Sequence, residues 1–307
     1  MNSILIFANP ISGRGRGRAF AQRLHKRLSA DGFDVRTFFK QPARVTDAEL
    51  PAKAHAAIVI GGDGTLRTVA QRLFHVTDAL PDQAHAPHAG PPLLVVPTGT
   101  ANLMGQHLGI KWTDRQLENQ VSDIIRNGRV RWLDTAEANG MLFLLIAGVG
   151  IDAHVVHEVD RRRSGPITKL SYALPALLAI NQYTYPSLSV KVDGRAVFAN
   201  KPGMVFVGNI REYGAGFPML PGAIGDDGLL DVCVLPCRDR KELLDHLMRA
   251  AAGEHTHGED VIYTRGTHIL IESPQEVPVQ IDGDTAGHTP LEIKLLPTRL
   301  PFLVQKS

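Results

Sequence analysis

The chain has 307 residues, of which 44% are hydrophobic and 21% are charged, and its net charge is +2 at pH 7. These values are typical of a globular protein with about two domains, and the small charge gives no support to nucleic-acid binding. Two cysteines in the whole chain exclude a disulfide scaffold and favour a reducing, cytoplasmic compartment.

The N-terminal stretch lacks the basic region and the long apolar core of a signal peptide. The longest uncharged stretch, 170–190, contains Pro175, Pro186 and several polar side chains, so it is a poor membrane span. We therefore expect no transmembrane segment.

The chain begins with an expected strand at 4–8, followed by Asn9, Pro10, Ile11, Ser12 and Gly13. An arginine- and glycine-rich stretch, 14–18, then leads into an expected helix at 19–28. A strand, a glycine-rich loop and a helix in this order bind phosphates in α/β folds. We interpret 14–18 as a mobile loop that closes over a polyphosphate, with a solvated basic loop as the alternative.

The segment 57–70 contains a second glycine-rich turn. An apolar strand at 58–60 ends at Gly61, Gly62, Asp63, Gly64 and Thr65, and a helix-like run follows. Three glycines in four residues let the backbone turn sharply and approach a ligand, and a helix start favours an anion such as phosphate. Asp63 beside phosphates would require a metal, a water or a substrate hydroxyl; the alternative is a glycine-rich turn with Asp63 as a helix cap.

The same part of the chain contains further expected elements. A strand at 33–39 and a short helix at 49–55 precede the second turn. A strand at 93–96 ends in a third turn, 97–102, and a helix at 114–127 has Gly128 as its expected C-cap. Glycine turns at the carboxyl ends of strands in one α/β layer would face the same crevice. His75, His85 and His88 have the spacing and setting of a solvated loop.

After about residue 134 short alternating or buried apolar runs predict a mainly antiparallel β domain. The expected strands are 135–138, 141–147, 188–192, 196–199, 203–207, 229–235, 268–272 and 277–282, with helices at 167–182 and 240–252. Arg161, Arg162 and Arg163 fit either a solvated loop or a contact to acidic lipid headgroups. Two acidic turns, 225–229 and 282–284, fit either hairpin turns or a site for a hard cation such as Mg²⁺.

Taken together and in this order, these motifs resemble the diacylglycerol kinase catalytic-domain family, which includes bacterial lipid kinases and sphingosine kinases. NAD kinases share the second glycine turn, but the later motifs fit the lipid kinases better. The matching segments are 9–13, 61–65, 97–102, 147–150, 226–228, 253–256, 261–263 and 282–284.

The resemblance implies an ATP site, a Mg²⁺ site and a general base. It assigns ATP to Asn9, Pro10, Ile11, Ser12, Gly13, Lys40, Gly62, Asp63, Gly64, Thr65, Leu66, Arg67, Thr68 and Thr100. It assigns a structural Mg²⁺ to Asp227 with Ile224 and Leu229, and catalysis to Asp284, with Asp63 and Asp282. The family has Glu at position 284, Asn and Glu at positions 67 and 68, and often Asn at position 145, where this chain has Asp284, Arg67, Thr68 and Leu145.

The implied fold is an N-terminal Rossmann-like α/β domain, similar to those of phosphofructokinases and NAD kinases, and a C-terminal antiparallel β-sandwich. The first domain is expected at 1–134 with a returning strand in 297–307, and the second at 135–296, with the active site in the interdomain cleft.

The implied function is phosphorylation of a lipid hydroxyl by ATP, with diacylglycerol as the first candidate and an apolar wall around 170–180 for the acyl chains. The alternatives are another acceptor, such as a sphingoid base, a glycolipid or NAD, and a nucleotide-binding regulator without turnover. We expect a cytoplasmic protein that meets its lipid at the inner face of the membrane. The oligomeric state is left open, with a homodimer as one alternative.

Overall fold

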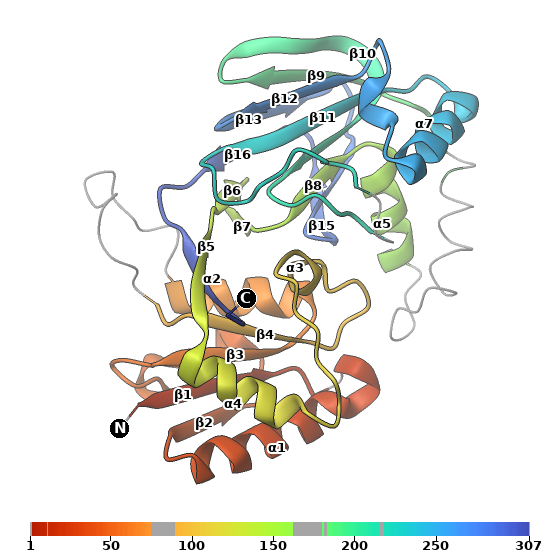
Figure 1. Ribbon diagram of the computed structural model, residues 1–307. Coiled ribbons are helices and arrows are strands. Elements are labelled where there is room, and N and C mark those ends of the chain that lie inside the picture. Colours follow the sequence, from red (N-terminus) through yellow and green to blue (C-terminus); the bar gives the residue numbers. More distant parts are fainter. Residues whose placement is uncertain are drawn as a thin grey trace. The chain divides into compact units, whose positions relative to one another are not determined.

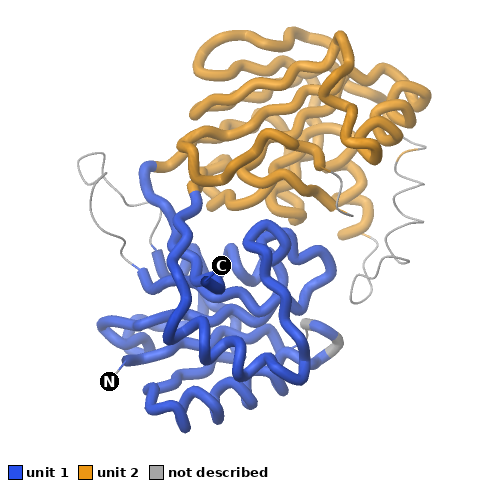
Figure 2. The backbone as a smooth tube through the Cα atoms, viewed as in Figure 1, with its two compact units in different colours: residues 1–133, 297–307 blue, residues 134–296 orange. Residues whose placement is uncertain are grey.

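The computed structural model describes residues 2–10, 12–74, 90–161, 180, 183–214 and 218–306. Within them the chain forms two compact units, 1–133 with 297–307 and 134–296 (Figure 2). Three predictions concern residues outside this description. They are the solvated loop with His75, His85 and His88, the loop residues Arg162 and Arg163, and nearly all of the helix expected at 167–182. No helix in the described part of the chain is long and apolar enough to cross a membrane.

The first unit is an α/β layer built on one mostly parallel sheet (Figure 1). Its strand order is β2-β1-β3-β4-β17-β5, and β5 alone runs antiparallel to its neighbour. The strands are β1 (Ser3–Ala8), β2 (Asp34–Phe38), β3 (Ala56–Gly61), β4 (Leu93–Pro97), β5 (Arg129–Leu133) and β17 (Leu300–Val304). The helices are η1 (Ser12–Gly15), α1 (Arg16–Ala30), η2 (Pro42–Arg44), η3 (Asp47–Glu49), α2 (Asp63–Phe74), α3 (Leu103–His107) and α4 (Leu117–Asn127).

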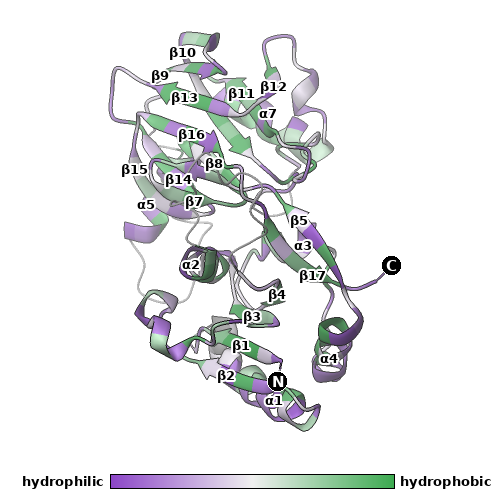
Figure 3. Ribbon diagram, turned by 90° about the vertical axis from the view of Figure 1, so that its left-hand side faces the viewer, coloured by the Kyte–Doolittle hydropathy of each residue, from purple (hydrophilic) through white to green (hydrophobic). Residues whose placement is uncertain are grey.

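The core of the first unit follows from continuous apolar strands, as expected for a sheet covered on both faces. Every residue of β1 and β3 is buried, and Figure 3 shows the hydrophobic colour along β3. Alternate residues such as Ile4 and Ile58 pack with Leu24 of α1 and Val121 of α4. Helix α1 is largely hydrophilic outside its four buried positions.

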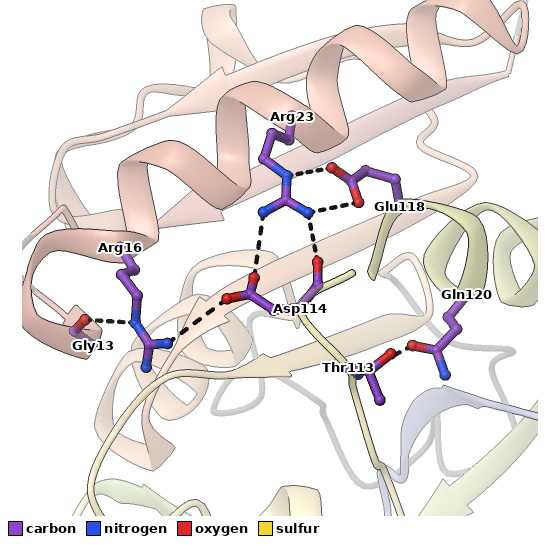
Figure 4. A network of polar contacts seen from close by, with 7 residues as sticks. All are labelled: Gly13, Arg16, Arg23, Thr113, Asp114, Glu118 and Gln120. Carbon is purple, nitrogen blue, oxygen red and sulfur yellow. Dashed lines mark hydrogen bonds and ion pairs between the residues drawn. The ribbon is translucent and has the colours of Figure 1, made fainter. Parts of the chain in front are cut away.

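Polar contacts join α1 to the segment around α4 (Figure 4). The Arg23 guanidinium pairs with the Glu118 carboxylate and lies 3.3 Å from an oxygen of Asp114. Arg16 donates to the Gly13 carbonyl at 3.2 Å. Helix α1 begins at Arg16, three residues earlier than predicted. Residues 16–18 of the expected mobile loop at 14–18 thus belong to the first turn of this helix.

The second unit is a β domain whose strand pairs are all antiparallel. One path runs β15-β14-β8-β10-β9-β13-β16-β6-β7, and β11 joins β10 to β12. The strands are β6 (Ala136–Ala138), β7 (Met141–Phe143), β8 (Ile146–Val149), β9 (Ser187–Val192), β10 (Arg195–Gly208), β11 (Leu230–Pro236), β12 (Ile262–Gly266), β13 (His268–Glu272), β14 (Pro278–Ile281), β15 (Asp284–His288) and β16 (Leu291–Leu295). The helices among its described residues are α5 (Ile151–Arg161), α7 (Arg240–Ala252) and η5 (His255–His257).

Valine and isoleucine side chains from both halves of this sheet form one core, including Val190, Val207, Ile271 and Val279. The α/β domain followed by an antiparallel β-sandwich confirms the predicted fold class. Cys233 and Cys237 are buried and free.

Several local predictions were wrong. The helix expected at 49–55 is only the short turn η3, held by a capping box between Thr46 and Glu49, and 50–55 is not helical. The strands expected at 196–199 and 203–207 are one strand, β10, which bends through register shifts. The strand expected at 141–147 is split into β7 and β8. By contrast, Gly128 is the C-cap of α4, as predicted, and has an extended conformation.

Candidate functional site

Three turns at the carboxyl ends of β1, β3 and β4 lie side by side in the first unit. The N–H of Asn9 donates to the Ile60 carbonyl at 3.0 Å, and the N–H of Thr98 donates to the Gly61 carbonyl at 2.9 Å. A Cβ added at Gly13 would lie 3.2 Å from Thr98 Cβ, so the first turn also reaches the third. The three glycine-containing turns therefore adjoin one another.

The strand order explains why this edge of the sheet can bind a ligand. The chain passes from β1 to β2 on one side, whereas β3 and β4 lie on the other side of β1. Ligands of open α/β sheets bind outside the carboxyl ends of the strands at such a switch point. The turns after β1 and β3 flank it.

Two glycines make the closest approach between these turns. A Cβ at Gly99 would lie 2.7 Å from Gly62 Cα, and a Cβ at Gly62 would lie 3.3 Å from Gly99 Cα. The two backbones therefore pass at a distance that only glycine allows at position 99. Bare backbone on both sides leaves room for a ligand to approach N–H groups closely.

The beginning of α2 supplies those N–H groups. The first helical bond runs from the Leu66 N–H to the Gly62 carbonyl at 3.1 Å. Residues 63–65 therefore have no acceptor within the helix, and their N–H groups emerge at its positive end. This arrangement fits the phosphates of ATP. The Leu66 side chain is buried in the core, so only its backbone can contribute to the predicted site.

Asp63 has a partner that the sequence did not reveal. Its two carboxylate oxygens accept hydrogen bonds from the N–H groups of Leu103, at 3.0 Å, and Met104, at 3.1 Å. Asp63 therefore caps α3 on the neighbouring turn. Burial raises the pKa of the Asp63 carboxyl, against the opposing effect of these N–H groups.

Asn102 holds the third turn in shape. Its backbone is left-handed, with φ 53°. Its side-chain oxygen accepts from the Gly99 N–H and its amide nitrogen donates to the Gly99 carbonyl, both at 2.8 Å. Thr100, a predicted ATP contact, lies exposed within the loop that this pair closes.

Lys40 and Thr68 are engaged by protein groups. Lys40 Nζ lies 2.6 Å from both carboxylate oxygens of Glu49, and this pair, with the Thr46 N–H, lowers the pKa of Glu49 to about 2. The Thr68 hydroxyl donates to the Gly64 carbonyl at 2.8 Å, within its own helix. Ile11, another predicted contact, lies outside the described residues.

In the second unit, Asp282 and Gly283 form a two-residue hairpin turn between β14 and β15. Both have positive φ, 53° and 85°, as the tight hairpin turns of Asp-Gly sequences require. The Asp282 carboxylate is buried and accepts from the N–H groups of Leu144 and Leu145, at 3.1 and 2.8 Å. Asp282 therefore fixes the turn, while Asp284 begins β15 as an exposed residue.

The predicted metal turn is held by a second acidic residue. Asp134 is buried, and its Oδ2 accepts from the Gly228 N–H at 2.7 Å. Asp227 accepts from the Leu229 N–H at 3.1 Å and lies 3.3 Å from the Arg265 guanidinium. Mg²⁺ takes carboxylate and carbonyl oxygens, whereas the Asp227 carboxylate is paired with Arg265, so the Mg²⁺ site at this turn stays a prediction. Ile224, whose carbonyl is a predicted ligand, is 43% exposed.

A buried path connects the two acidic turns. The Asn209 N–H donates to the Leu145 carbonyl at 2.8 Å, and the Asn209 amide donates to the Asp134 carbonyl at 2.6 Å. Asp282 is therefore linked to Asp134 through Leu145 and Asn209. The sequence analysis missed Asp134 and Asn209, although a polar residue directly after a buried apolar strand was a usable signal for Asn209.

A groove of 1430 Å³ in the second unit lies elsewhere. It is lined by α7, by 196–202 of β10 and by 258–262. The acidic turn at 282–284 lies instead beside the other end of β10, because Val207 pairs with Ala147, which pairs with Ile281. The groove is therefore separate from the candidate site. Asp63 and Asp284 belong to different units, and their convergence in one active site stays a prediction.

Two protein families match the chain. Residues 3–138 match the diacylglycerol kinase catalytic domain, and residues 146–304 match the YegS C-terminal NAD kinase beta sandwich-like domain.

Diacylglycerol kinases of other bacteria are similar to this chain over nearly its whole length. A diacylglycerol kinase of Bacillus subtilis (strain 168) is 25% identical over 314 residues, covering 100% of this chain and 98% of the relative. One of Mycobacterium tuberculosis (strain ATCC 25618 / H37Rv) is 27% identical over 312 residues, covering 99% and 95%. A crystal structure of a diacylglycerol kinase from Bacillus anthracis str. Sterne has the same fold, with a TM-score of 0.68, 24% identity and coverage of 97% and 96%.

Proposed function

Because the chain belongs to the diacylglycerol kinase catalytic-domain family, we propose that it transfers the γ-phosphate of ATP to the hydroxyl group of diacylglycerol or a similar lipid. The observation that carries the ATP half of this proposal is the contact between Gly62 and Gly99 beside the N-terminus of α2. This contact leaves bare backbone next to the free N–H groups of residues 63–65, at a switch point of a parallel sheet. Free N–H groups at a helix N-terminus in such a place bind phosphate groups.

Phosphoryl transfer depends on positioning and on neutralisation of charge. In our proposal the N–H groups of residues 63–65 bind phosphate oxygens. Asp284 accepts the proton of the attacking lipid hydroxyl, and Asp282 holds the turn that carries it. Bound Mg²⁺ would neutralise phosphate charge at a site held by Asp63 and waters. A second Mg²⁺, held by Asp227, Ile224 and Leu229, would have a structural role. We place the reaction at the inner membrane surface, where ATP and lipid meet.

The test is transfer of labelled phosphate from ATP with Mg²⁺ to a panel of acceptors. Vesicles of phosphatidylcholine with diacylglycerol, with sphingosine or with a glycolipid are compared with soluble NAD, and the products are identified by mass spectrometry. We expect phosphatidic acid from the diacylglycerol vesicles. Phosphorylation of another acceptor alone would replace the proposed substrate.

Asp284→Ala should reduce transfer by at least 100-fold, the order expected for loss of a general base, whereas Asp284→Glu should retain it. Asp123→Ala, at an exposed position of α4 outside every predicted motif, is the matched control. Near-normal transfer by Asp284→Ala would remove the assignment of the base.

A regulator that binds nucleotide without turnover is the second candidate. The bonds of Asp63 to α3 and of Thr68 to Gly64 favour it, because both side chains are engaged by the protein. Tight ATP binding in calorimetry with no phosphorylated product from any acceptor would support this candidate over the kinase.

A further inference from the structure

A buried carboxylate in the second unit takes no part in the chemistry proposed above. Asp152 is the second residue of α5, and the Tyr213 hydroxyl donates to its Oδ1 at 2.6 Å. Its other oxygen, Oδ2, is buried without a hydrogen-bond partner. Burial raises the pKa of Asp152 to about 6, and the Tyr213 hydroxyl and the Gln280 amide oppose this rise. A buried charge of this kind requires an explanation, because it is costly to keep.

The Gln280 side chain lies beside this carboxylate. Gln280 is fully buried in β14, and its Oε1 accepts from the Gly283 N–H at 2.9 Å. Its Nε2 is buried and has no hydrogen-bond partner. A Cβ at Gly148 would overlap Asp152 Oδ2 and lie 2.8 Å from Gln280 Nε2, so the two groups crowd the same point. The carboxamide thus directs its oxygen to Gly283 and its nitrogen toward Asp152.

This orientation matters because of where Gly283 lies. Gly283 is the second residue of the tight turn, and Asp284 follows it directly. If the carboxamide turned over, its NH₂ group would meet the Gly283 N–H, and this bond to the turn would be lost. Asp152 prevents this reversal, because only an N–H donor is compatible with a carboxylate at that place.

We propose that Tyr213, Asp152 and Gln280 are positioning residues that fix the turn before Asp284 and thereby hold its carboxylate for proton transfer. Tyr213 orients Asp152, Asp152 orients the Gln280 carboxamide, and the carboxamide binds the Gly283 N–H. The catalytic consequence rests on the proposed kinase function, whereas the hold on the turn does not.

The test exchanges the two interacting groups. Asp152→Asn, with its oxygen on the Tyr213 hydroxyl, places its NH₂ group against the Gln280 NH₂ group, and Gln280→Glu places two carboxyl groups together, so each single variant creates a mismatch. The double variant Asp152→Asn with Gln280→Glu restores a donor opposite an acceptor and keeps an oxygen for Gly283. Gln280→Met removes the bond to the Gly283 N–H and the amide group beside Asp152 at similar volume, and Tyr213→Phe removes only the hydroxyl.

The first readout is hydrogen exchange of the Gly283 amide by NMR, without substrate. We expect exchange about tenfold faster in Gln280→Met and in both single variants, the worth of one hydrogen bond, and near wild type in the double variant. The Gly194 amide is the internal control, because Asp193 and Gly194 form a turn with similar positive φ values, 48° and 78°, elsewhere in this unit. Unchanged Gly283 exchange in the single variants would overturn the proposal, whatever the protein's activity.

The second readout is kinetic. The single variants and Tyr213→Phe should lower kcat about tenfold with KM for ATP within twofold, and the double variant should recover at least half of wild-type kcat. Thr267→Val, which removes a hydroxyl bond to the Asp193 turn, should leave kcat unchanged. A loss of kcat that the double variant does not restore, in proteins that melt like the wild type, would overturn the positioning role.

Discussion

Replacing Asp63 by alanine should weaken the first unit as well as remove phosphate transfer. The carboxylate accepts two backbone N–H groups at the start of α3, at 3.0 and 3.1 Å. Each bond contributes about 1–1.5 kcal/mol, and the burial that raises the pKa of Asp63 offsets part of this gain. We therefore expect Asp63→Ala to lower the free energy of unfolding by about 2 kcal/mol, and Asp63→Asn, which keeps one acceptor, by about half as much.

The assay is urea denaturation followed by tryptophan fluorescence. The chain contains two tryptophans, Trp112 and Trp132, and both lie in the first unit, so the signal reports on that unit. Asp123→Ala is the matched control, because this carboxylate on α4 bonds only the exposed Asn127 side chain in the described contacts. Its transition should stay within about 0.5 kcal/mol of wild type.

A transition of Asp63→Ala that coincides with that of the control would refute the structural role of the carboxylate. Loss of activity in this variant would then be attributable to catalysis alone. If the unit is weakened as expected, activity has to be measured well below the urea transition, where the variant is fully folded. The two readouts thus separate a cap from a metal ligand.

Three further outcomes are expected. Gly99→Ala places a Cβ 2.7 Å from Gly62 Cα, so it should destabilise the first unit by about 3 kcal/mol and prevent ATP binding, measured by fluorescence denaturation and calorimetry. Glu49→Gln releases Lys40 and should lower KM for ATP by roughly twofold to fivefold if Lys40 reaches the nucleotide; an unchanged KM would remove Lys40 from the site. The pKa of Asp152 is raised to about 6, so the native state binds this proton more tightly than the unfolded chain. The stability of the wild type relative to Asp152→Asn should accordingly fall by about 2 kcal/mol as the pH rises from about 4 to 6, and a flat difference would contradict the raised pKa.

Sequence patterns predicted the local structure well where one apolar face or one glycine turn decided it. The strand before Gly61 and the helix at 240–252 belong to this class, because burial and end signals agree there. Helix α5 was missed, since its polar residues follow a buried strand directly with only Gly150 between them. Strand β10 was divided at Asn200, which adopts a positive φ inside the bend.

The candidate site shows the same division. The turns themselves were recognisable, because glycine and aspartate in a short span have few other uses. Their partners were not, because contacts between residues far apart in the chain leave no local pattern. Asp63 with Leu103 and Asp282 with Leu145 are such pairs, separated by 40 and 137 positions.

The sheet of the first unit is complete only when strand β17, which follows the whole second unit in the chain, has been added. This strand lies between β4 and β5, so the space beside Leu93 is filled only by residues 300–304. During synthesis the second unit, 134–296, therefore leaves the ribosome before the sheet of the first unit can be completed. The first sheet must wait, with an open edge and exposed apolar strands, for a segment made after the second unit, and a chaperone that shields this edge would raise the yield of folded protein.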